Sequence, residues 1–199
     1  MDYNPQFIRQ AQFIIWAQWV FFNLFGWAFG LFATWGTQTD TITRFGWIAM
    51  FLGIGQWLIL RNYLRRPTWL WIGLTAVGMM AAQYLAQQFV DYLIAQQIVS
   101  FQGVSMLSGF LIGGVIGVLI GACLSLAHLI LLPRTGTLIR DWFMANTVGW
   151  GLGFQVGTIL GALLFSADYR FTSLIAVLLS AIISGLWVTQ LIHLPQSER

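Results

Sequence analysis

Two histidines, His128 and His193, are the side chains of this 199-residue chain best suited to bind a cofactor. Each lies near the end of a long apolar segment, shortly before Pro133 or Pro195. A neutral imidazole is a good axial ligand, so a pair at similar depth could bind haem or chlorophyll. In the alternative, each ring bonds a backbone carbonyl or an interfacial water. No supporting motif accompanies the histidines, so we expect no cofactor, with chlorophyll, haem or a carotenoid as the open alternative.

Other reactive patterns are absent from the sequence. It contains no HExxH, GxSxG, Walker or CxxC motif and no pair of carboxylates placed for acid–base work. Its one cysteine, Cys123, stands among small apolar residues and is predicted to be a buried side chain. A single cysteine excludes an intrachain disulfide and a cysteine-based metal cluster. We therefore expect a protein that is not an enzyme, with no catalytic residue and no metal site.

The polar side chains inside the apolar segments are neutral. Charged residues stand in or beside the connecting segments, which argues against a proton pump, an ion-coupled carrier or an intramembrane protease. The predicted role of these neutral groups is hydrogen bonding between helices, and the lining of a cavity is the alternative. The predicted helix–helix contacts are Asn23, Gln56, Thr75, Asn146 and Gln190, and the wider set adds Gln83 and Gln155.

The composition predicts a protein that resides in lipid. Hydrophobic residues make up 58% of the chain and charged residues 8%, against roughly 25% charged in soluble proteins. All nine basic residues are arginines, and they are spread over segment ends, so the net charge of +3 does not form a nucleic-acid-binding patch. We expect membrane lipids and other integral membrane proteins as partners, and no nucleic acid.

Six segments have the length of a membrane-spanning helix. Seven of the nine arginines lie on the side that holds both ends of the chain and the segments 61–67 and 133–141. Because cytoplasmic loops are enriched in Arg and Lys, both termini are predicted to be cytoplasmic. The expected fold is an all-α membrane protein with six transmembrane helices near 13–35, 45–61, 68–90, 104–131, 142–165 and 172–193.

A repeated pattern groups these helices in pairs. A Trp is followed after three residues by a small polar residue and after two more by Gly, as in Trp19–Asn23–Gly26, Trp71–Thr75–Gly78 and Trp142–Asn146–Gly149. The pattern predicts one integral membrane domain, 1–199, built from three tandem two-helix hairpins at about 1–66, 67–139 and 140–199. Since the three copies run in the same direction, their symmetry axis should lie along the membrane normal.

Small residues four apart predict close helix packing. Such pairs place two small side chains on one helical face, where helix backbones can approach closely in lipid. Near the 61–67 segment, Trp57, Trp69 and Trp71 are predicted to lie at the membrane interface beside the arginines. The small pairs are Ala49 and Gly53, Gly117 and Gly121, Gly149 and Gly153, and Ala181 and Gly185.

The stretch GxGQWLILR, which ends at Arg61, is followed by Trp69-x-Trp71 and Thr75-Ala76-x-Gly78. It resembles the repeated hairpins of small polytopic membrane proteins that are common in cyanobacteria. The match is good over 46–82, fair over 117–155 and marginal over 181–194. The resemblance implies a fold type and a photosynthetic bacterial membrane, plasma or thylakoid. It transfers no catalytic residue, because that group is largely uncharacterised.

These observations favour a non-enzymatic membrane scaffold, assembly factor or accessory subunit that packs against a larger membrane complex, for example a photosynthetic one. The basis is a large apolar aromatic surface, with 16 Phe and 11 Trp, in a chain without intramembrane charge. The alternative is a passive transporter or binding protein for a lipid, a pigment or another apolar small molecule.

Overall fold

A computed structural model describes residues 5–61, 69–98, 106–132, 136–165 and 169–191. These ranges form six α-helices and contain no β-strand, which confirms the all-α prediction. The helices are α1 (Pro5–Ala33), α2 (Thr41–Leu60), α3 (Leu70–Ala95), α4 (Met106–His128), α5 (Gly136–Phe165) and α6 (Tyr169–Leu191).

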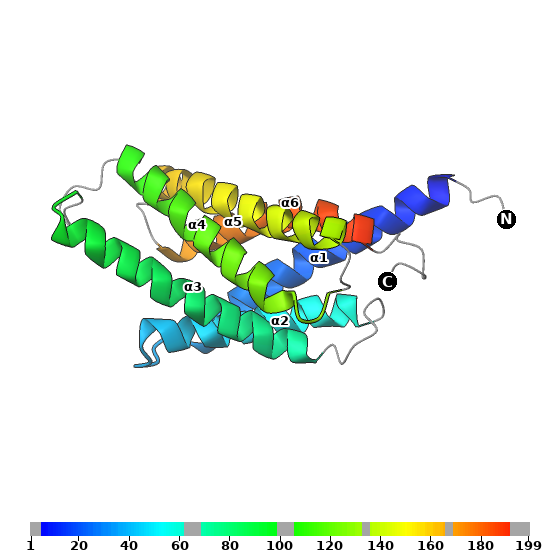
Figure 1. The fold of residues 1–199 in the computed structure, drawn as a ribbon, viewed down its shortest axis with the longest axis horizontal. Helices are drawn as coiled ribbons and strands as arrows, with labels where there is room; N and C mark the ends of the chain where they lie inside the picture. The colour runs from blue at the N-terminus through cyan, green and yellow to red at the C-terminus, as the bar shows by residue number, and fades with distance from the viewer. Residues whose placement is uncertain (1–4, 62–68, 99–105, 133–135, 166–168, 192–199) are drawn as a thin grey trace.

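The six helices form a closed ring. Each helix packs against the next one in the sequence, and α6 returns to pack against α1. Successive helices run in opposite directions, so the beginnings of α1, α3 and α5 lie at the same end as the ends of α2, α4 and α6 (Figure 1). The most extensive packing joins α4 and α5, which belong to different predicted hairpins. Contacts between hairpins are thus as important to the ring as contacts within them.

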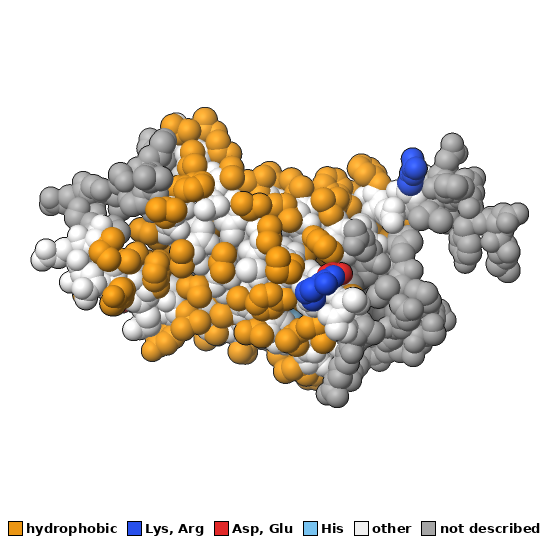
Figure 2. Space-filling view, turned by 45° about the horizontal axis from the view of Figure 1, so that its top comes forward, with side chains coloured by type: hydrophobic (Ala, Val, Ile, Leu, Met, Phe, Trp, Pro, Cys, Tyr) orange, Lys and Arg blue, Asp and Glu red, His pale blue; other side chains and the backbone are white. Residues whose placement is uncertain are grey.

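Four of the helices, α1, α2, α4 and α6, are long and apolar enough to cross a membrane. Figure 2 shows that hydrophobic side chains are spread over the whole described part of one face, with few charged side chains among them. The ion pair of Arg140 and Asp141, with 3.0 Å between Nε and Oδ1, lies in the first turns of α5, at an end of the ring. This arrangement supports the prediction of an integral membrane protein.

The helix α3 extends without interruption through the polar stretch that follows its apolar part. Gln87 and Asp91 are exposed on this extension and Gln83 is half-buried. α3 and α5 contain 26 and 30 residues, so at 1.5 Å per residue they are about 39 and 45 Å long. Their length is sufficient for a span.

Asp40 caps the N-terminus of α2. Its Oδ1 accepts a hydrogen bond of 3.0 Å from the backbone N–H of Thr43, which satisfies one of the free donors of the first turn. This hydrogen bond from Thr43 lowers the pKa of the Asp40 carboxyl below its ordinary value. The ionised carboxylate therefore stabilises the start of α2 more than the protonated acid does.

We expect this cap to make stability depend on pH. Since the folded pKa is the lower one, the contribution of Asp40 is present above its unfolded pKa and is lost as the pH falls through the folded value. Asn is an equally good cap without a titratable group, so D40N should lack this part of the acid dependence. Unfolding of both proteins in detergent between acidic and neutral pH tests this. Parallel curves would contradict the prediction.

The close packing of α4 on α5 depends on glycine. A Cβ atom on Gly121 would lie 2.5 Å from the carbonyl oxygen of Asn146 and 2.6 Å from Cα of Thr147, closer than real Cβ atoms approach backbone. One turn earlier, a Cβ on Gly117 would collide with the carbonyl of Trp150. The small pair predicted from the sequence thus lies at a helix interface, where backbones meet directly.

Candidate functional site

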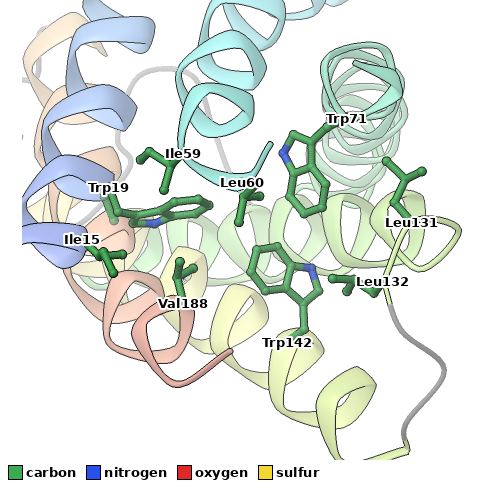
Figure 3. Packing of buried hydrophobic residues seen from close by; sticks show 10 residues of the cluster. Ile15, Trp19, Ile59, Leu60, Trp71, Leu131, Leu132, Trp142 and Val188 are labelled. Carbon is green, nitrogen blue, oxygen red and sulfur yellow. The ribbon is translucent and has the colours of Figure 1, made fainter. Parts of the chain in front are cut away.

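Three tryptophans meet inside the ring, near the end where α3 and α5 begin. Trp19, Trp71 and Trp142 come from α1, α3 and α5, and their side chains are almost completely buried. The Trp142 ring lies edge-on to Trp19 at 6.3 Å and to Trp71 at 5.5 Å between centroids. Figure 3 shows the three indoles turned toward the interior, with Leu60 of α2 among them. We call these three residues the tryptophan layer.

A second layer follows eight residues later on the same helices. It consists of Trp27, Met79 and Trp150, which are buried with Ile48, Leu52 and other apolar side chains. The centroids of Trp27 and Trp150 are 6.0 Å apart. Residues eight apart are offset by about 80° around a helix, within one broad helical stripe, and lie about 12 Å further along. The two layers therefore fill the interior of the ring at two depths.

The prediction that Trp71 lies at the membrane interface is wrong. Its side chain is 0% exposed, whereas that of Trp69 is 63% exposed. Residues two positions apart on a helix point about 200° away from each other. Only one of the two tryptophans can therefore face outward. Trp57 is half-buried, and the guanidinium carbon of Arg61 lies 5.6 Å from its ring centroid.

Buried hydrogen bonds connect α1, α2 and α3. The Asn23 amide donates to the carbonyl of Trp19 at 2.7 Å, and its Oδ1 accepts from Nε2 of Gln56 at 2.8 Å. Gln56 in turn accepts at Oε1 from the indole N–H of Trp71, also at 2.8 Å. Gln56 thus uses both ends of its amide to link the two neighbouring helices. The structure places these two predicted residues, Asn23 and Gln56, in direct contact.

The next link joins α3 to α4 through His128. The Thr75 hydroxyl donates to the carbonyl of Trp71 at 2.7 Å, and its oxygen lies 2.9 Å from Nε2 of His128. Because a hydroxyl has one proton, Thr75 accepts at that second contact and Nε2 of His128 carries the hydrogen. The imidazole also stacks on Trp71, with 3.7 Å between centroids and 13° between planes.

The side chains of α5 and α6 make further hydrogen bonds, among them one within α5 and one between α6 and α1. Asn146 donates to the carbonyl of Trp142 in its own helix at 3.0 Å, as Asn23 does to Trp19. The indole of Trp19 donates to Oγ of Ser184 on α6 at 3.1 Å, which closes α6 onto α1. Ser184 was not predicted from the sequence. The signal was the spacing of the buried serines 173, 180 and 184, which are seven and four residues apart on one face of α6.

Of the two predicted histidines, the structure describes His128. His193 and the side chain of Gln190 lie outside the described residues. The His128 ring is covered by Trp71 on one face and has Trp142 tilted against it at 5.9 Å. Within the described structure, Nδ1 of His128 is buried without a hydrogen-bond partner. A planar macrocycle could approach it only if one of these tryptophans moved.

On the outside of the ring, α4 and α5 border a groove of about 480 Å³. Its walls are apolar apart from Thr147 and Gln155 of α5, and two glycines, Gly114 and Gly151, form part of its lining. The other lining residues are Leu111, Val115, Val118, Leu119, Val148 and Leu152. Most of these are exposed, so the groove is open to the surroundings of the ring.

Removal of one polar partner tests the internal chain of hydrogen bonds. The N23A variant leaves Nε2 of Gln56 without its acceptor, and we expect the free energy of unfolding to fall by about 0.6 kcal/mol, the average for such bonds in membrane helices. A double-mutant cycle of N23A with Q56A, measured by unfolding in mixed micelles, isolates the pair. Strictly additive effects would contradict a direct contact.

The described residues define a class: an all-helical protein with membrane-type helices in a closed ring, whose polar side chains are largely hydrogen-bonded inside the ring. Within those residues, no group of three His, Cys, Asp or Glu side chains could hold a metal ion. No protein-family model, curated protein or solved structure matches the chain.

Proposed function

We propose that the protein is a non-enzymatic scaffold or accessory subunit of an integral membrane complex. The observation that carries this proposal is the filled interior of the ring. The tryptophan layer occupies one depth, Trp27, Met79 and Trp150 occupy the next, and the hydrogen bonds of Gln56 join α1, α2 and α3 between them. A molecule with this interior offers its outer surface for function, and in lipid the packing of side chains on that surface decides whether it binds a partner or faces acyl chains.

In this proposal all six helices span the membrane and both termini are cytoplasmic. Thr75 of α3 and Asn146 of α5 are buried inside the ring, whereas Gln155 of α5 lines the groove between α4 and α5. Arg9, Arg61 and Arg140 are all exposed at the end of the ring where α1 begins, which fits the excess of arginine expected on the cytoplasmic side. The resemblance to cyanobacterial proteins favours a plasma or thylakoid membrane.

An aromatic stripe on α1 is a surface suited to partner contact. Phe21, Phe25 and Phe29 are exposed and stack in order, with centroids 5.9 and 6.1 Å apart. Phe51 of α2 lies edge-on to Phe29 at 4.9 Å and broadens the stripe. Aromatic side chains supply a large, rigid contact area at low conformational cost.

The test uses native membranes solubilised in mild detergent. We expect the wild-type protein to migrate with a larger complex, and the F25A/F29A variant to be released from it while remaining folded. A V77A variant serves as the matched control, since Val77 is an equally exposed apolar residue on α3. Migration of the wild-type protein only as a free monomer would contradict the proposal.

The groove between α4 and α5 favours a second candidate, a binding protein for a lipid, pigment or other apolar molecule. Its volume and its few polar groups among apolar walls are typical of small-molecule sites. An absorption spectrum and a lipid extract of the purified protein discriminate the two. A bound pigment or lipid that is absent from a G151L variant, whose larger side chain fills the groove, would favour the second candidate.

A further inference from the structure

The two glycines of the α4/α5 groove, Gly114 and Gly151, are opposed by side chains of the neighbouring helix. A Cβ on Gly151 would meet first a methyl group of Val118 at 3.0 Å, and one on Gly114 would meet the side chain of Gln155 at 2.7 Å. Both neighbours are side chains, in contrast to the backbone atoms that oppose Gly121. Gly114 therefore makes room for the side chain of Gln155 and Gly151 for that of Val118, and neither glycine is opposed first by backbone.

The groove also contains a side-chain amide, that of Gln155, which is not hydrogen-bonded within the described part of the ring. Gln155 makes no hydrogen bond to another described residue, and its Nε2 lies over Gly114. At the other end of the groove, Oγ1 of Thr147 is buried and also lacks a partner in the described structure. An amide without a partner in hydrocarbon is costly, so a polar group from outside the chain is expected to reach Gln155.

We propose that this groove is the interface of a symmetric dimer, and that its occupant is a second copy of this chain. The proposal assumes membrane insertion and is independent of any larger complex. In a bilayer, a second copy with the same orientation places its Gln155 at the same depth. A carboxamide is both donor and acceptor, so two Gln155 side chains related by a twofold axis satisfy each other. An acyl chain offers no such group.

The shapes on the two sides of the groove support the same arrangement. Val148 and Leu152 project from α5 beside the groove and are 41% and 47% exposed. In a twofold dimer these residues of one copy enter the groove of the other, above Gly114 and Gly151. Small residues on one helix and branched apolar residues on its partner are the usual basis of helix association in lipid. One short stretch of α5 thus supplies the projecting residues, Val148 and Leu152, and also Gly151 in the lining of the groove.

The experiment is disulfide cross-linking of the full chain in liposomes. Cys123 is replaced by serine, and a single cysteine is introduced as L152C, or as V77C on α3 for the control. We expect oxidation to give covalent dimers of L152C at least tenfold faster than of V77C, because a disulfide needs its two Cα atoms within about 7 Å. Equal rates, or no dimer with L152C, would overturn the proposal.

Two further variants show whether the cross-link depends on the groove. G151L in the L152C background should abolish the cross-link by filling the groove, whereas G73L should retain it, since nothing lies within 4 Å of a Cβ on Gly73. If G151L does not fold, Q155L tests the amide and should slow cross-linking several-fold. Unchanged cross-linking in Q155L would overturn the role of the amide. Labelling of the groove by a photoreactive phospholipid, without any L152C dimer, would assign the groove to lipid.

Discussion

Replacement of Trp71 by alanine is expected to lower the free energy of unfolding by about 3–5 kcal/mol, the range for removal of a fully buried large aromatic side chain. Trp71 is 0% exposed and contacts Trp142, His128 and Gln56. Its removal leaves a cavity in the tryptophan layer and also leaves Oε1 of Gln56 without a donor. Reversible unfolding in mixed micelles, followed by circular dichroism, measures the change.

Two matched variants separate the contributions at this position. W71F keeps most of the ring but loses the N–H, so we expect a smaller loss of about 1–3 kcal/mol from the unsatisfied Gln56 acceptor. W69A removes a tryptophan that is 63% exposed and should change stability by no more than about 0.5 kcal/mol. If W69A were as destabilising as W71A, the assignment of Trp71 to the interior would be incorrect.

Substitution of Gly121 by valine is expected to have the second-largest effect. The new Cβ would lie 2.5 Å from the carbonyl oxygen of Asn146, so α4 and α5 must move apart. Overpacking of this kind costs about 1–3 kcal/mol and occasionally more. Because α5 carries Trp142, the separation should also alter the near-ultraviolet circular dichroism of the tryptophans. The unfolding assay used for Trp71 measures the loss.

The control for Gly121 is Gly73 on the exposed side of α3. A Cβ there meets nothing within 4 Å, and alanine favours the helix by about 0.5–1 kcal/mol over glycine. G73A should therefore leave stability unchanged or raise it slightly. G121A is the matched variant at the helix contact, and equal destabilisation by G73A and G121A would contradict a specific role for the close approach of α4 and α5.

The repeat of Trp, small polar residue and glycine marked residues that make contacts between helices. It did not indicate the direction in which their side chains point. Trp19, Trp71 and Trp142 occupy equivalent positions in that pattern, and the structure brings them into one layer. Spacing alone did not show that these indoles face inward, since tryptophans near arginines are also typical of the membrane interface. The neutral polar residues Asn23, Gln56 and Thr75 were predicted as contacts, but their partners were not.

The hydrogen-bond partners of Ser184 and His128 could not be predicted from the order of residues in the chain. Ser184 bonds to Trp19, 165 positions away in the sequence, because α6 closes the ring on α1. The sequence suggests His128 as a ligand, whereas its Nε2 is engaged by Thr75 and its ring by Trp71. Both contacts depend on which helices become neighbours.

Amino-acid composition and the length of the apolar segments were sufficient to predict an all-helical protein compatible with a bilayer, because burial of backbone groups in hydrocarbon permits few other structures. They could not indicate which face of each helix is internal. In water a polar stripe marks the outer face of a helix, but in lipid both faces are apolar. The assignment of Trp71 to the interior and of the α4/α5 groove to the outside therefore arose from ring closure.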